Sequence, residues 1–203
     1  QDRAKFPNKN MTNILDEVDP VKQLKFIHAA LPNLKNIALV YSSDDRIYKE
    51  VAQFEAAAKA DGIHTQKMMM QQMSDLYSIS KQFKPNTQAI FIFKDEPVVA
   101  GIATLVQQAE ARHIPVIASD DGSVEKGAAF AVGVSERQIG VGGAKLAAKV
   151  LEGSPASQVP VKLMTNYSVF VNKAAMKKQG VKLAKIQMAA KTFNYPVVDL
   201  AWS

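Results

Sequence analysis

Short apolar runs alternate along this chain with longer stretches whose apolar residues recur at helical spacing. The runs predict buried strands over residues 37–41, 63–70, 89–93, 114–118 and 128–134. The longer stretches predict helices over 20–31, 47–58, 75–83 and 97–113. Strands that alternate with helices in this way indicate βαβ units, and the crossovers between parallel strands are right-handed. We therefore predict an α/β fold, with a doubly wound, mostly parallel sheet and helices on both faces.

The pattern divides the chain into three segments. Residues 1–20 are polar and rich in Pro and Asn, and we expect an entry or hinge segment that ends where Asp19 caps the first helix ahead of Pro20. Residues 21–134 form the predicted Rossmann-like ligand-binding lobe. Residues 135–203 form a C-terminal segment with a different character. The elements expected there are a glycine-containing helix over 136–151, short strands over 161–164 and 169–171, and a helix over 173–179 capped by Asn172. The pattern assigns no definite element to the tail, 182–203.

Three of the predicted strands end in polar residues. The three groups are Ser42-Ser43-Asp44-Asp45, Lys94-Asp95-Glu96 and Ser119-Asp120-Asp121. In a parallel sheet the carboxyl ends of the strands share one edge, where ligands bind in open α/β folds. Serine hydroxyls and helix N–H groups can hold a carboxylate, and aspartates can hold an ammonium group. The candidate ligand-binding residues are Tyr41, Ser42, Ser43, Asp95, Glu96, Ser119 and Asp120, and the chemistry suits a small zwitterion such as an amino acid. The alternative is that these residues are simply the N-caps that every strand-to-helix loop needs.

Composition narrows the classes of function. The 203 residues are 47% hydrophobic and 22% charged, which is ordinary for a globular protein. The formal net charge is +6, but the lysines are spread over predicted helix faces without an arginine-rich stripe, so we expect no nucleic-acid partner. The absence of cysteine excludes disulfides and thiolate chemistry. The methionines at 68–70 and 73 are predicted to fill the core, with an adaptable binding surface as the alternative.

Sequence motifs for catalysis are missing. The chain has no nucleophile elbow, no phosphate-binding Gly-Lys-Ser/Thr loop and no dinucleotide motif after a strand. The three histidines are scattered, and His113 is predicted to interact with the end of a helix. No spacing suggests a metal site. We expect a protein that is not an enzyme and that needs no cofactor or metal.

The order of these elements resembles a known family, the substrate-binding proteins of ABC transporters with a type I periplasmic-binding-protein fold. The resemblance is to the branch that includes tryptophan- and tyrosine-binding lipoproteins. It is carried by N-M-T-N-I at 10–14, V-K-Q-L-K-F-I at 21–27, L-P-N-L-K-N-I-A-L-V-Y at 31–41, I-P-V-I-A-S-D-D-G-S-V-E-K-G-A at 114–128, the helix at 139–153, and V-F-V-N at 169–172. Members of the family begin with a further lobe, so the resemblance implies that this chain supplies one lobe of a two-lobed protein.

The resemblance implies extracytoplasmic capture of a solute, aromatic or other amino acids among them, and its delivery to a membrane permease. It also implies a periplasmic or extracytoplasmic location, with a lipid anchor on the precursor. The helix at 136–152 would pack on the other lobe, so we expect either that lobe or a second copy of the chain to cover it. The alternative function is a ligand-sensing domain of a signalling or regulatory system, because the same fold carries both roles.

Overall fold

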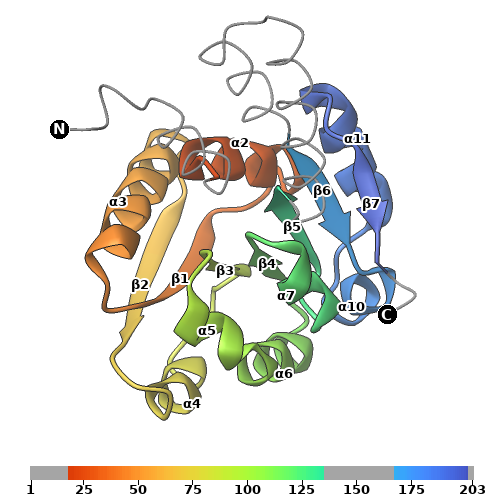
Figure 1. Ribbon diagram of the computed structural model, residues 1–203. Coiled ribbons are helices and arrows are strands. Elements are labelled where there is room, and N and C mark those ends of the chain that lie inside the picture. The colour runs from red at the N-terminus through yellow and green to blue at the C-terminus, as the bar shows by residue number, and fades with distance from the viewer. Residues whose placement is uncertain (1–17, 135–166, 201–203) are drawn as a thin grey trace, which may run out of the picture.

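The computed structural model describes residues 18–134 and 167–200, and these residues build one seven-stranded sheet (Figure 1). The strands are β1 (Asn36–Ser42), β2 (His64–Met70), β3 (Ala89–Ile92), β4 (Val116–Ala118), β5 (Phe130–Gly133), β6 (Ser168–Val171) and β7 (Val197–Asp199). Their order in the sheet is β2-β1-β3-β4-β5-β6-β7. The strands β1 to β5 run parallel, β6 is antiparallel to β5, and β7 is parallel to β6.

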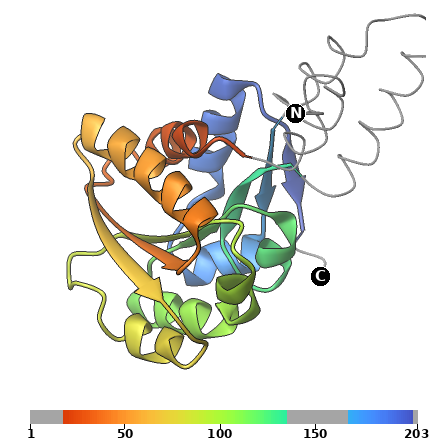
Figure 2. The same ribbon diagram turned by 60° about the vertical axis from the view of Figure 1, so that its left-hand side comes forward.

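Two layers of helices enclose the sheet (Figure 2). The helices α2 (Pro20–Ala30), α3 (Asp45–Ala60) and α11 (Leu183–Phe193) cover one face. The helices α4 (Asp75–Ser80), α5 (Glu96–Ala100), α6 (Ile102–Arg112) and α7 (Asp121–Glu125) cover the other. A short helix, α10 (Lys173–Lys178), connects β6 to the segment that leads into α11. The predicted fold class, a mostly parallel sheet with helices on both faces, is confirmed.

Burial explains why the apolar runs became strands. In β1, every residue from Ile37 to Ser42 is buried, because helices pack on both faces of the sheet. One core contains a stacked pair of rings, Phe54 and Phe91, whose centroids lie 4.4 Å apart. Such offset contacts between buried rings stabilise a core beyond the area that they remove from water.

The first helix begins as its sequence predicted. The carboxylate of Asp19 accepts a hydrogen bond from the Val21 amide at 2.9 Å, and Pro20 occupies the first helical position, where its missing N–H does no harm. The predicted cap at Asn172 is also confirmed, because its side-chain oxygen accepts a hydrogen bond from the Ala175 amide at 3.1 Å.

Several predicted boundaries were wrong. The helix expected over 97–113 is two helices, α5 and α6, which meet at Gly101, where a Cβ would lie 2.5 Å from Leu76 Cδ2. The strand expected from residue 114 starts two residues later, since the Ile114 amide donates to Ala109 at the end of α6 and Pro115 has no N–H to donate. The methionine prediction was correct for Met68 and Met70, which are buried, and wrong for Met69 and Met73, which are exposed.

Residues 167–200 of the C-terminal segment belong to the same sheet as the preceding strands. The tail to which no element was assigned contains α11 and β7, and β6 and β7 extend the sheet beyond β5. The pattern of the tail was weak because β7 is an edge strand of three residues, two of which are exposed. The expected helix at 136–151, the strand at 161–164 and the entry residues 1–17 lie outside the described residues. The boundaries proposed at 20 and 134 stay predictions.

Gln179 joins the C-terminal segment to the parallel part of the sheet. Its side chain is fully buried, it accepts a hydrogen bond from the Val116 amide at 2.8 Å, and it donates one to the Gly127 carbonyl at 2.7 Å. We expect Gln179→Leu to lower the free energy of unfolding by about 2 kcal/mol or more, because two buried backbone groups lose their partners. Urea unfolding measures the change. The control is Gln187→Leu at an exposed position on α11; equal effects of the two substitutions would contradict the role given to Gln179.

Candidate functional site

The carboxyl ends of β1, β3, β4 and β5 lie beside one another along one edge of the sheet, which we call the carboxyl edge. The register places Val40 beside Ile92, Phe91 beside Ile117 and Ala118 beside Ala131, so the four strands end at similar heights. The three polar strand ends predicted from the sequence therefore meet. Hydrogen bonds connect the first group to the second, and the third group to the last residue of β3.

The first connection joins β1 to the loop after β3. One carboxylate oxygen of Asp95 accepts from the Ser42 amide and the other accepts from the Ser42 hydroxyl, both at 2.7 Å. Asp95 is only 2% exposed and Ser42 only 8%. Asp95 is also the residue before α5, but its side chain does not cap that helix because it turns back to Ser42. The two residues are thus partners of each other, and their role in the edge is to hold it together.

The second connection joins β3, β4 and β5 to helix α2. The Ser119 hydroxyl donates to the Ile92 carbonyl at 2.9 Å. The side-chain amide of Gln23, from α2, donates to the Ser119 hydroxyl at 3.0 Å and to the Val132 carbonyl at 3.1 Å. Ser119 and Gln23 are both buried. Gln23 was not among the candidate residues, although the sequence carries a signal for it, because this polar residue stands on the face of α2 that otherwise buries apolar residues.

Close packing fixes the same corner of the site. A Cβ on Gly133, at the end of β5, would lie 2.5 Å from the carbonyl oxygen of Ser119. Only a residue without a side chain allows β4 and β5 to approach in this way. The start of the β4–α7 loop therefore packs closely against the end of β5 on one side, and the Ser119 hydroxyl bonds it to the end of β3 on the other.

Asp120 and Ser123 differ from these residues because they have buried oxygens without partners. Among the described residues, Oδ1 of Asp120 and Oγ of Ser123 are buried and make no hydrogen bond. Asp120 precedes α7, and its side chain makes no capping bond to that helix. Ser123 is fully buried. Leaving a polar atom buried and unpaired costs about 1–3 kcal/mol, so such atoms need an explanation.

The other candidate residues have more ordinary surroundings. Tyr41 is buried, its ring meets that of Tyr48 edge-to-face at 6.2 Å, and burial raises the pKa of its hydroxyl. Ser43 and Glu96 are exposed at the carboxyl edge. The side chain of Ser43 has room to meet a ligand, whereas its amide donates to the Met70 carbonyl at 3.1 Å.

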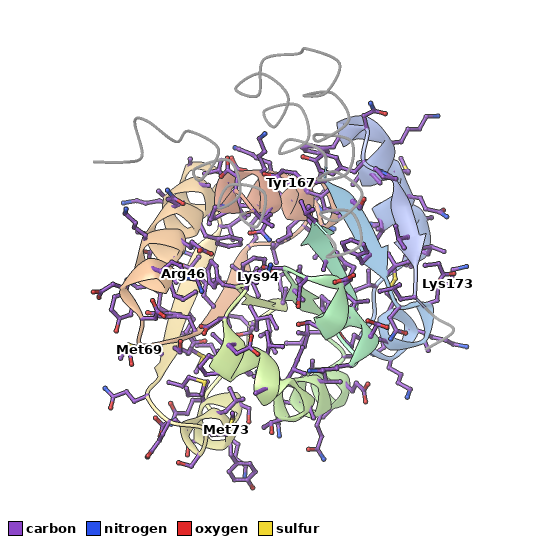
Figure 3. The ribbon with its side chains drawn as sticks, viewed as in Figure 1. Arg46, Met69, Met73, Lys94, Tyr167 and Lys173 are labelled. Atoms are coloured by element: carbon purple, nitrogen blue, oxygen red, sulfur yellow. The ribbon has the colours of Figure 1, made fainter. Side chains whose placement is uncertain are left out.

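Two further residues at this edge were not predicted from the sequence. Arg46, in the first turn of α3, lies beside Lys94 and donates to its carbonyl oxygen at 3.2 Å (Figure 3). Tyr167 directly precedes β6, whose first residue pairs with Gly133, so Tyr167 also lies at the carboxyl edge. Its hydroxyl accepts from the Asp19 amide at 3.3 Å, and burial raises its pKa. Tyr167 lies at the carboxyl edge because β6 pairs antiparallel with β5, and no local sequence pattern predicts that pairing.

Nothing in the described part of the chain gathers three or more residues able to hold a metal ion. Within the same ranges, 18–134 and 167–200, no helix has the length and apolar character needed to cross a membrane.

The chain belongs to a family described as ABC transporter substrate binding protein, whose model matches residues 2–192. An uncharacterized protein of Rickettsia prowazekii is 38% identical over 173 residues, which cover 85% of this chain and 57% of that protein. A tyrosine-binding protein of Clostridioides difficile is 23% identical over 172 residues, covering 84% of this chain and 50% of the relative. The chain thus spans about half the length of the curated relatives that it matches.

Solved structures share the fold. A substrate binding protein with adhesive properties from Clostridium difficile, in its ligand-free, open form, has a TM-score of 0.74 at 22% identity and covers 91% of this chain and 61% of its own. An ABC domain from Streptococcus pneumonia in complex with L-Trp has a TM-score of 0.68 at 22% identity, with 89% and 62% covered.

The paired hydrogen bonds of Asp95 give a test of its role. We expect Asp95→Ala to lower the free energy of unfolding by about 2–4 kcal/mol, because the buried amide and hydroxyl of Ser42 both lose their acceptor. Asp95→Asn should retain most of the stability, since its amide oxygen can accept from the Ser42 N–H while its NH₂ donates to a rotated Ser42 hydroxyl. Urea unfolding compares the three proteins. An Ala variant as stable as the unmodified protein would show that this pair does not hold the edge together.

Proposed function

We propose that this chain is the ligand-binding lobe of the solute-binding component of an ABC transporter, and that it holds a small molecule such as an amino acid at the carboxyl edge. The observation that carries the proposal is the pair of buried oxygens without partners, Asp120 Oδ1 and Ser123 Oγ. A polar ligand supplies the missing hydrogen bonds and so offsets the cost of burying these atoms. Membership of the substrate-binding family supports the same conclusion.

The chemistry of the edge favours a ligand that carries both charges. The carboxylate of Asp120 suits an ammonium group, and the hydroxyls of Ser43 and Ser123 can donate to a carboxylate. Asp95, Ser42 and Ser119 position the loops and make their hydrogen bonds to each other and to the backbone. The relatives named for tyrosine binding and crystallised with L-Trp make amino acids the natural first class of ligand to test.

One lobe gives half of a binding cleft. Pockets that hold small molecules bury most of the ligand surface, so a second surface has to close over the carboxyl edge. We propose that the second surface is another lobe or another chain, and that the loaded protein delivers its solute to a membrane permease on the extracytoplasmic side, with a lipid anchor on the precursor. The function requires binding and release alone, and we assign no catalytic step to any residue.

Thermal unfolding of the natural full-length protein with each of the standard amino acids tests the proposal. A bound ligand raises the midpoint of unfolding by mass action. Asp120→Ala should weaken the binding of the ligand that is found by about tenfold or more, because a charge-assisted hydrogen bond is lost. Ser123→Ala should weaken it less, since only the ligand group is charged in that hydrogen bond, whereas the Asp120 carboxylate and the ligand's ammonium group are both charged.

The matched control is Glu125→Gln, which removes a carboxylate from an exposed position of the same helix, α7. Its ligand affinity should equal that of the unmodified protein. If no amino acid shifts the midpoint, the ligand class is wrong. If a ligand binds equally well to the Asp120→Ala protein, the site lies elsewhere.

A further inference from the structure

A pocket of about 280 Å³ opens at the opposite end of the sheet, where β1, β3 and β4 begin. We call it the amino-edge pocket. Its walls come from four separate parts of the chain: the loop of residues 31–34 after α2, Gln88 just before β3, the turn around His113 and Pro115 between α6 and β4, and residues 180–185 at the start of α11. It shares no residue with the carboxyl edge.

One side of the pocket is basic. Lys182 and Lys185 line it, and neither has an ion-pair or hydrogen-bond partner for its side chain among the described residues. No Asp or Glu belongs to the lining, so nothing within the pocket neutralises the two ammonium groups. Lys182 also precedes α11, where no side chain caps the helix. The free amide groups at the start of that helix add to the positive potential.

The other side of the pocket is apolar. Leu31, Pro32, Leu34, Pro115 and Val181 form its walls. Leu34 is 2% exposed and Val181 7% exposed, so they are parts of a fixed surface. Binding pockets for organic molecules combine such apolar walls with a few convergent polar groups, and this volume is at the small end of their range.

The shape of the pocket is held by His113 and Gly180. His113 ends α6 in a left-handed conformation with φ of 58°, and its Nδ1 lies 3.0 Å from the Lys178 carbonyl. A carbonyl oxygen only accepts, so Nδ1 carries the proton and donates. Gly180 has φ of 76°, and a Cβ there would lie 2.8 Å from the His113 ring. Any other residue at position 180 would be strained by the positive φ and would displace the His113 ring, so glycine is needed to keep this wall of the pocket.

We propose that the amino-edge pocket binds a small organic anion, a carboxylate or phosphate ester carried on a compact apolar body. Lys182 and Lys185 hold the oxyanion, and the wall formed by Leu31, Pro115 and Val181 contacts the apolar body. The side-chain oxygen of Gln88 accepts from the amides of Lys35 and Asn36, and its NH₂ group donates to the Asn33 carbonyl at 3.1 Å, so we assign Gln88 to the wall of the pocket. The site is separate from the proposed solute site and does not depend on it.

Nuclear magnetic resonance of the isotope-labelled full chain tests this proposal with four probes. Phenyl phosphate and benzoate carry an oxyanion on an apolar ring, inorganic phosphate carries the charge alone, and benzyl alcohol carries the ring alone. We expect phenyl phosphate or benzoate to shift the amide signals of residues 180–186 in a saturable way and to bind more tightly than the other two probes. If phenyl phosphate binds more tightly than benzoate, the pocket prefers a phosphate ester; if benzoate binds more tightly, it prefers a carboxylate.

The variant is the double substitution Lys182→Gln and Lys185→Gln, which should weaken binding about tenfold or more. The control is Lys177→Gln with Lys191→Gln, which removes the same charge from exposed positions outside the pocket and should leave the affinity unchanged. The proposal is overturned if no probe shifts these amides at millimolar concentration, if benzyl alcohol binds as tightly as the anions, or if both double variants lose affinity equally. Amino-acid binding at the carboxyl edge should be the same in all these proteins. The result of this test is therefore independent of the thermal-unfolding test of the proposed solute site.

Discussion

The hydrogen bonds between neighbouring loops at the carboxyl edge are the constraint on which the rest of the molecule's proposed function depends. Parallel strands bring loops together, but loops on their own are mobile. Here the carboxylate of Asp95 accepts hydrogen bonds from Ser42 of the adjacent strand, and the Ser119 hydroxyl donates to the end of β3. Gln23, on helix α2, donates to Ser119 after β4 and to Val132 of β5. A site built on such a frame keeps its geometry when the ligand leaves, which lowers the cost of ordering it on binding.

The same edge separates two kinds of polar residue that look alike in the sequence. Asp95 and Asp120 each follow a buried strand and precede a short helix. In the fold, both oxygens of Asp95 are satisfied by Ser42, whereas one oxygen of Asp120 is buried without a partner. The first arrangement is what a structural residue needs, and the second has a cost that a ligand can remove. The hydrogen bonds that each side chain makes or lacks are therefore the reason why we propose a ligand-binding role for Asp120 and a structural one for Asp95.

The sequence predicted the fold class because the dominant signal, continuous apolar runs between amphipathic stretches, is the signal of strands covered on both faces. The sequence also predicted that the polar groups meet at one edge, because the carboxyl ends of parallel strands share an edge. It failed where the outcome depends on contacts far along the chain. Nothing local shows that Asp95 faces Ser42, 53 residues away, or that antiparallel pairing brings Tyr167 to the same edge. Gln23 was the exception, since a polar residue on an apolar helix face is visible in the pattern.

The two ends of the sheet carry opposite chemistry, and the direction of the chain explains the difference. Helices that follow parallel strands begin at the carboxyl edge, so residues such as Asp44, which caps α3, collect there and make that edge acidic. After β5 the order changes, because β6 runs the other way and α11 then begins at the amino edge. The start of α11 thus lies beside the ends of α2 and α6, and Lys182 precedes it without a side-chain cap. The reversal of one strand therefore gives this lobe a second, basic opening that a sheet of parallel strands alone would not have.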